Sequence, residues 1–186
     1  MVRFLPLLSL IILYLAISIP GVNPWEEDSS VYDVLKDHGL PMGLFPKGVK
    51  DFTINGTGHF LVHLDQACNA KFESELHYDR NVSGTLSYGQ IGSLSGISAQ
   101  ELFLWFPVKG IRVDVPSSGV IYFDVGVVSK QFSLSLFETP RDCLAVRDGQ
   151  AEAIESGRLI AEAVSKSQLG ELRYQLDQEN FGRVVL

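Results

Sequence analysis

The stretch from Val31 to Val49 reads V-Y-D-V-L-K-D-H-G-L-P-M-G-L-F-P-K-G-V, and its glycines and prolines dictate the path of the backbone. The first eight residues place apolar side chains at helical spacing, so a short helix is expected over 31–38. A residue of the preceding Asp-Ser-Ser is expected to cap it. Gly39 should end the helix, because helices commonly stop at a glycine in the left-handed conformation. The two prolines that follow fix an extended, turning path into the first strand.

Downstream of this stretch, apolar residues recur at every second position in short runs separated by turn residues. The runs are centred on 52–54, 60–64, 76–78, 86–88, 111–115, 121–127 and 132–136, and turns are expected at 55–58, 79–84, 89–96 and 116–119. Runs this close leave no room for crossover helices between parallel strands. We therefore expect a mainly β fold, an antiparallel β-barrel or sandwich of short strands with a short N-terminal helix and a weakly helical C-terminal tail. Both forms of sheet fit the pattern.

One segment, Leu102–Val108, is apolar at consecutive positions, which indicates a strand that is buried on both faces. One face is expected against the core. The other is covered either by the 31–38 helix or by the C-terminal segment, or else it lines a groove for an apolar ligand. The residues predicted to line such a pocket are Phe103, Trp105, Met42 and Phe45.

The N-terminus has the pattern of a secretory leader, with Arg3 before an apolar run from Phe4 to Ile19. That run is shorter than the roughly 20 residues that cross a bilayer. We expect a signal peptide over 1–21, a polar linker over 22–30, a single β domain over 31–143 and a C-terminal extension over 144–186, helical or partly disordered. The mature chain is then expected to be secreted and extracellular, and without a transmembrane segment.

The chain has only two cysteines, Cys68 and Cys143, and an even count in an oxidising route favours a disulfide between them. The bond would close a loop of about 75 residues, for which chain entropy gives an upper estimate of about 4 to 5 kcal/mol. Two N-x-[ST] sequons, at Asn55 and Asn81, are candidate glycosylation sites.

The sequence contains few motifs that are typical of catalysis or of cofactor binding. A formal net charge of −7, without a lysine or arginine cluster, argues against a nucleic-acid partner. No phosphate-binding glycine motif occurs, and the sequence G-S-L-S-G at 92–96 has leucine where a nucleophile elbow needs serine. His59 and His63 lie about 13 Å apart if extended, too far to share a metal. We expect no cofactor, no metal and no catalytic residue that a motif identifies.

Four segments carry a resemblance to a known family: the stretch from Val31 to Val49, the strand-like Gly58–Leu64, E-L-F-L-W-F-P-V at 101–108 and F-D-V-G-V-V-S-K at 123–130. Together they resemble the plant domain of unknown function 538, from Val31 to Cys143. Members of this family have been likened to the lipid-binding bactericidal/permeability-increasing proteins of animals. Esterase-like or pigment-degrading activity has also been suggested for members. The resemblance thus implies a stable secreted domain without assigning it one reaction.

Three functional hypotheses follow. The first, which we favour, is a secreted β domain that binds an apolar or amphipathic, lipid-like small molecule and is not an enzyme. The second is an esterase-like hydrolase whose catalytic residues come together only in the fold. The third is a stress-related cell-wall interaction module that presents a surface to a protein or a polysaccharide.

Overall fold

The computed structural model describes residues 30–102, 104–126, 128–146 and 150–181. The expected signal peptide over 1–21 lies outside the described residues, as does the expected linker except for Ser30.

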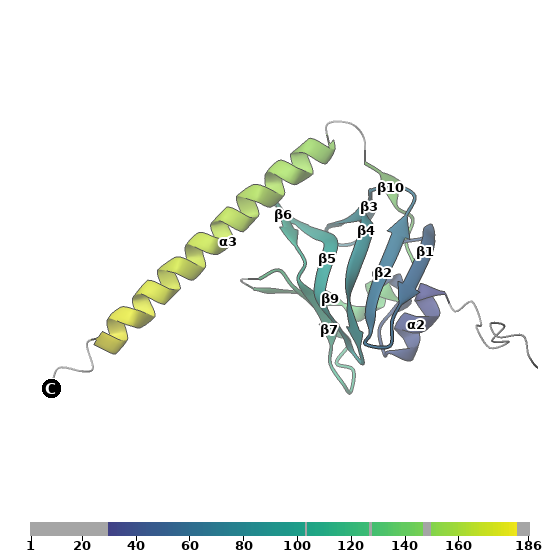
Figure 1. Ribbon diagram of the computed structural model, residues 1–186, viewed down its shortest axis with the longest axis horizontal. Helices are drawn as coiled ribbons and strands as arrows, with labels where there is room; N and C mark the ends of the chain where they lie inside the picture. Colours follow the sequence, from purple (N-terminus) through teal and green to yellow (C-terminus); the bar gives the residue numbers. More distant parts are fainter. Residues whose placement is uncertain (1–29, 103, 127, 147–149, 182–186) are drawn as a thin grey trace, which may run out of the picture.

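The described chain forms one antiparallel sheet of ten strands, with a helix at each end (Figure 1). Strands follow one another in the order β1-β2-β4-β5-β7-β8-β9, while β3 lies between β4 and β10, and β6 pairs with β5. The expected mainly β, antiparallel class is confirmed. In the part of the chain that the structure describes, no ladder joins β9 back to another edge, so the curved sheet stays open. The elements are α2 Val31–Asp37, the 3₁₀ helix η1 Met42–Leu44, β1 Val49–Ile54, β2 His59–Leu64, β3 Cys68–Lys71, β4 Glu75–Ser87, β5 Gln90–Glu101, β6 Leu104–Pro107, β7 Gly110–Val113, β8 Val120–Asp124, β9 Ser129–Ser133, the 3₁₀ helix η2 Leu134–Phe137, β10 Leu144–Ala145 and α3 Gln150–Phe181.

The N-terminal helix has the limits that its sequence predicts. Ser30 caps α2, and its hydroxyl accepts a hydrogen bond from the backbone N–H of Asp33 at 3.3 Å. Gly39 follows the helix with φ of +70°, the left-handed conformation that glycine adopts at low cost. Val31 and Leu35, on one face of the helix, are buried in the core.

The segment after α2 fills the concave side of the sheet. A Cβ atom on Gly43 would lie 2.5 Å from the carbonyl oxygens of Phe137 and Thr139, so η1 and η2 approach closely only because this residue is glycine. Phe45 is 1 % exposed, and its ring meets that of Phe60 edge-on at 5.9 Å between centroids. The interior is thus filled by side chains of the sheet and of this N-terminal segment.

A buried hydrogen bond ties the same segment to the middle of the sheet. The hydroxyl of Tyr78, on β4, donates to the backbone carbonyl of Leu44 at 3.0 Å. Burial raises the pKa of Tyr78 above its ordinary value, so the phenol stays protonated and remains a donor.

Two turns expected from the sequence are wrong. The segment 79–84 lies inside the 13-residue strand β4, and most of 89–96 lies inside the 12-residue strand β5. Glycine and serine act there as strand residues at bends: the register of β4 and β5 shifts between Tyr78 and Thr85. At the bend, a Cβ on Gly96 would lie 2.3 Å from the carbonyl oxygen of Asn81. The two strands cross closely because residue 96 has no side chain.

The last expected strand run, 132–136, ends earlier than predicted, because β9 stops at Ser133. Leu134 and Leu136 lie in η2 rather than in a strand. This 3₁₀ turn carries Phe137 into the core, where its ring stacks on that of Phe72 at 4.5 Å.

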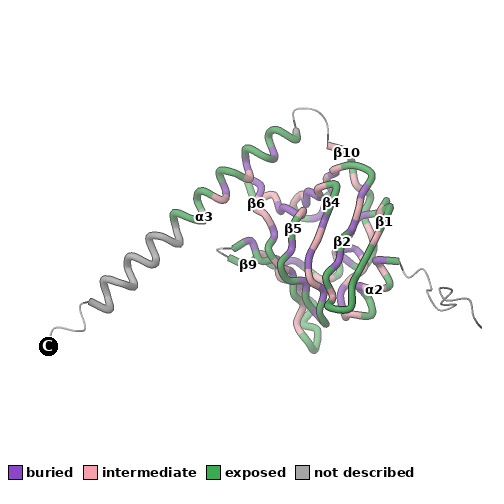
Figure 2. The backbone as a smooth tube through the Cα atoms, in the orientation of Figure 1, coloured by how far each residue is buried: buried purple, intermediate pink, exposed green. Residues whose placement is uncertain are grey.

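Helix α3 starts beside β6 and projects diagonally away from the sheet (Figure 1). Its first turns contact β6 and include buried positions (Figure 2). Ile154 and Ala161, in these turns, are 4 % and 0 % exposed. The second face of the apolar segment at β6 is therefore covered by the C-terminal helix, one of the two covers that the sequence allowed. The helical expectation for the C-terminal extension is confirmed.

No helix within the described ranges is both long and apolar enough to span a membrane.

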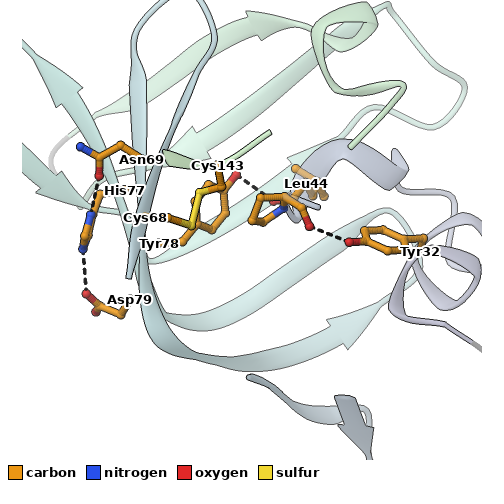
Figure 3. The surroundings of a disulfide bond; sticks show 9 residues. Tyr32, Leu44, Cys68, Asn69, His77, Tyr78, Asp79 and Cys143 are labelled. Carbon is orange, nitrogen blue, oxygen red and sulfur yellow. Dashed lines mark hydrogen bonds and ion pairs between the residues drawn. A yellow bond between two sulfur atoms is a disulfide. The ribbon is translucent and has the colours of Figure 1, made fainter. Parts of the chain in front are cut away.

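The disulfide predicted from the sequence is present. Cys68 on β3 is bonded to Cys143, with 5.5 Å between the Cα atoms (Figure 3). The two residues after Cys143 form β10, which pairs with β3 at Cys68 and Asn69. The bond therefore fixes the end of the β domain, just before α3, to β3, which pairs with β4.

We expect that removing this bond destabilises the protein by about 2 to 4 kcal/mol, because the unfolded chain regains the freedom of a long loop. Urea unfolding of the oxidised protein, the reduced protein and the Cys68→Ala, Cys143→Ala double variant measures the effect. The reduced protein and the double variant should unfold at similar, lower urea concentrations, and dithiothreitol should not change the double variant. Equal midpoints for all samples would contradict a stabilising role.

Candidate functional site

The residues predicted to line an apolar pocket lie in separate places. Phe103 is outside the described residues. Phe45 is buried in the core, while Trp105 is 5 % exposed on the opposite face of the sheet, where its ring lies 5.9 Å from that of His77. Met42 is half-buried and lines an open groove. The three described residues therefore do not share one cavity.

The groove at Met42 runs between η1 and η2 and has a volume of about 500 Å³. Its apolar walls include Leu40 and Leu134, and its polar walls include Ser133 and Glu138. The groove is broad and open to water, so an apolar ligand would remain partly hydrated there.

A more apolar cavity lies at the seam where the sheet stays open, between β9 and the β5–β6 hairpin. It has a volume of about 240 Å³ and its walls are almost entirely apolar; the lining residues are Ala99, Glu101, Phe106, Val125, Val128 and Lys130. Ala99 and Phe106 are cross-strand partners, in the same row as the core residue Leu76. The floor of this seam pocket is therefore the core itself.

One cation stands at the rim of the seam pocket. The Nζ atom of Lys130, on β9, donates to the hydroxyl of Ser74 at 3.0 Å and to the carbonyl of Gln100 at 3.3 Å, and it forms an ion pair with Glu101. These contacts bridge the open edge with a side chain instead of a backbone ladder. The seam thus combines an apolar interior with a charged rim.

A polar cluster occupies the opposite, outer face of the sheet under α3. There His77, on β4, is 4 % exposed and lies between Asn69 and Asp79 (Figure 3). Its Nδ1 atom is 2.7 Å from the Asn69 amide oxygen, and its Nε2 atom is 3.1 Å from Asp79 Oδ1. A carboxylate only accepts, so Nε2 donates to it.

Helix α3 contributes a cation to this cluster. The guanidinium of Arg158 lies 3.2 Å and 3.5 Å from the two carboxylate oxygens of Asp79, an arrangement that joins the helix to β4. The pKa of Asp79 is lower than its ordinary value, chiefly because His77 hydrogen-bonds its carboxylate. Partial burial opposes this shift, and the hydrogen bond and charge of Arg158 add to it.

A serine, a histidine and an aspartate thus come together here, although no sequence motif predicted it. Ser98, on β5, is the cross-strand partner of His77 and is 1 % exposed. Its Oγ atom has no hydrogen-bond partner, and both ring nitrogens of His77 already have partners. The observed arrangement therefore lacks the serine–histidine hydrogen bond that activates a nucleophile.

His59 and the two sequon asparagines are exposed, whereas His63 is half-buried. His59 and His63 are on β2, and Nδ1 of His63 is 2.6 Å from the side-chain oxygen of Asn81. Asn55 is exposed in the β1–β2 turn, where its side-chain oxygen accepts hydrogen bonds from Thr57. Among the described residues, no group of three or more potential ligands is placed to hold a metal.

We expect that Asp79→Asn lowers the free energy of unfolding by about 1 kcal/mol at neutral pH, because the variant loses charge-assisted hydrogen bonds from His77 and Arg158. The side chain is 38 % exposed, so solvent screening keeps the effect small. Since the pKa of Asp79 is lowered by folding, its contribution is complete above the unfolded pKa and is lost as the pH falls through the folded pKa.

Urea unfolding of both proteins from neutral pH to about pH 2.5 tests this sign, since carboxyl groups titrate in that range. The difference between them should shrink as the solution becomes more acidic. Asp51→Asn, at an exposed position on strand β1, serves as the control and should show no such convergence. A difference for Asp79→Asn that stays constant down to the lowest pH would refute the charge-assisted role.

A comparison with protein families matches residues 31–138 to the family described as "Protein of unknown function, DUF538". No curated protein and no solved structure matches the chain. The match extends from α2 to just beyond η2 and thus includes β1 to β9, the seam pocket and most of the polar cluster, whereas Arg158 lies beyond it. This chain belongs to the DUF538 family.

Proposed function

We propose that the protein binds the apolar end of an amphipathic, lipid-like small molecule in the seam pocket. The observation that carries the proposal is the composition of the pocket: an almost entirely apolar interior that reaches the core, with Lys130 at the rim. Burial of apolar surface in such a pocket drives binding, and a cation at the rim favours an anionic head group.

The size of the pocket restricts the ligand. Its volume of about 240 Å³ lies below the range of about 300 to 1,000 Å³ that is typical for drug-sized ligands. A short acyl chain, or one end of a longer chain, suits this volume better than a fused ring system. Lys130 has contacts with Ser74, Gln100 and Glu101, so a carboxylate head group competes with Glu101 for the ammonium.

The disulfide agrees with a protein that works in an oxidising compartment. We propose that the chain is secreted, as the N-terminal sequence predicts, and that Asn55 and Asn81, both exposed, are glycosylated on that route. The extracellular setting would give access to lipids or waxes that are released from cells.

Octanoate and 1-octanol are suitable probes, because they share an eight-carbon chain and differ in charge. Isothermal titration calorimetry of the oxidised protein should show saturable binding of both, with octanoate bound more tightly. Val128→Asp should weaken binding about tenfold or more, because it places a charge in the apolar wall. Lys130→Gln should remove the preference for octanoate.

Val115→Asp is the matched control, since Val115 is 66 % exposed and lies away from the pocket, while Val128 is 64 % exposed. Met42→Gln is a second control, which makes the wall of the groove between η1 and η2 more polar. Both controls should bind the probes as the unmodified protein does. The proposal fails if neither probe binds, if the two valine variants behave alike, or if Met42→Gln alone abolishes binding.

A further inference from the structure

A cavity of about 190 Å³ lies between the outer face of the sheet and the first turns of α3. Its lining includes Asp79 from β4, Ser98 from β5, Lys109 after β6, and Arg158 and Glu162 from α3. Further residues of β5, β6 and the β6–β7 link complete the lining: Leu94, Ser95, Gly96, Ile97, Pro107 and Val108. This α3 cavity is on the opposite side of the sheet from the seam pocket, so the apolar ligand does not account for it.

A buried hydroxyl at this cavity has no partner in the chain. Ser98 is 1 % exposed, and its Oγ atom has no hydrogen bond to any described residue. The Nε atom of Arg158 is likewise buried without a partner, although the other guanidinium nitrogens reach Asp79. Buried polar atoms in folded proteins are nearly always hydrogen-bonded, to protein or to ordered water. Both residues line the α3 cavity, so water there, or a ligand that replaces the water, lies beside these atoms.

The charges of the walls define the chemistry of that molecule. The lining residues include two cations, Lys109 and Arg158, and two anions, Asp79 and Glu162, so the lining itself has no net charge to attract an ion. Glu155, outside the lining, also pairs with Arg158 at 3.6 Å. A neutral ligand also loses less hydration energy on burial than an ion does. A hydroxyl group both donates and accepts; it can donate to a carboxylate, accept from a guanidinium or ammonium group, and do either with serine.

We propose that the α3 cavity binds a small uncharged polyhydroxy compound, a polyol or a single sugar ring, through the Ser98 hydroxyl, the Asp79 and Glu162 carboxylates and the Arg158 guanidinium. The volume corresponds to about six water molecules, which suits one sugar ring and excludes an oligosaccharide from being fully enclosed. Lys109, one of the lining residues, is exposed to solvent.

The experiment is a titration of the full, oxidised chain, labelled with ¹⁵N, with glycerol, xylitol, myo-inositol, L-arabinose, D-glucose and D-galactose. At least one of these should give saturable shifts of the backbone amides of Gly96, Ile97 and Ser98 and of the Nε–H resonance of Arg158. Glucuronate and glucosamine should bind more weakly than glucose, because each brings an unbalanced charge.

Two variants separate ligand contacts from general effects on α3. Ser98→Ala and Glu162→Gln should each weaken binding about fivefold, the usual consequence of losing one hydrogen bond. Ser98→Ala should leave the fold intact, because it removes a hydroxyl that has no partner in the protein. Glu152→Gln, on the first turn of α3 and outside the cavity walls, is the matched control and should bind normally.

The proposal is overturned if no compound of the panel gives saturable shifts up to 50 mM, since the cavity then holds water only. It is also overturned if Ser98→Ala and Glu162→Gln bind as the control does. Binding of glucuronate or glucosamine in preference to every neutral compound would contradict the argument from wall charge. None of these results bears on octanoate binding at the seam pocket, which is tested separately.

Discussion

The close crossing of β4 and β5 at Gly96 is the constraint on which the rest of the structure depends. A side chain on residue 96 would collide with the carbonyl of Asn81, and the glycine takes φ of +91° there. The crossing bends both strands, which are long enough for β4 to pair with β2 and β3 and for β5 to pair with β6 and β7. One sheet therefore curves around a core instead of forming two separate layers. The N-terminal segment occupies the concave side, and α3 covers part of the convex side.

The bend also explains why the two sides of the sheet differ in chemistry. Side chains alternate between the faces, so Leu76 and Tyr78 point into the core while His77 and Asp79 point out toward α3. The inner row continues through Ala99 to Phe106 and ends at the seam, where the sheet has no further strand to cover it. An apolar pocket there is a direct result of a sheet that curves without closing.

Local sequence determines much of this architecture, and those parts were predictable. The cap at Ser30, the stop at Gly39 and the period-two runs depend on neighbours in the chain. The pairing of Cys68 with Cys143 was predictable because the chain offers no other pair. By contrast, glycine and serine at 89–96 resemble a turn locally, and only pairing with β4 on one side and with β7 on the other makes that segment a strand. Local preference was overridden there by tertiary contacts.

The cavities were beyond prediction for a related reason. The walls of the seam pocket come from β5, β6, the β8–β9 turn and β9, whose approach depends on the curvature of the whole sheet. His77 lies in a strand segment whose side chains alternate between the two faces, so alternation alone places its side chain on the face away from the core. It is buried because α3, more than 70 residues later, lies over that face and brings Arg158 to Asp79, a sequence separation of 79. The only sign of this covering helix in the sequence was the segment at β6, which is apolar on both faces and therefore needs an element packed against each face.

The cover that α3 provides has a chemical consequence for the serine, histidine and aspartate beneath it. The Nε2 atom of His77 donates to Asp79, and its Nδ1 atom lies within hydrogen-bond distance of Asn69. These contacts hold the ring in place, and neither ring nitrogen is available to Ser98. The Asp79 carboxylate in turn is shared between His77 and Arg158. Such a network orients its groups and joins the helix to the sheet. The hydroxyl of Ser98 stays outside this network and has no partner among the described residues, and the proposed polyhydroxy site rests on that feature.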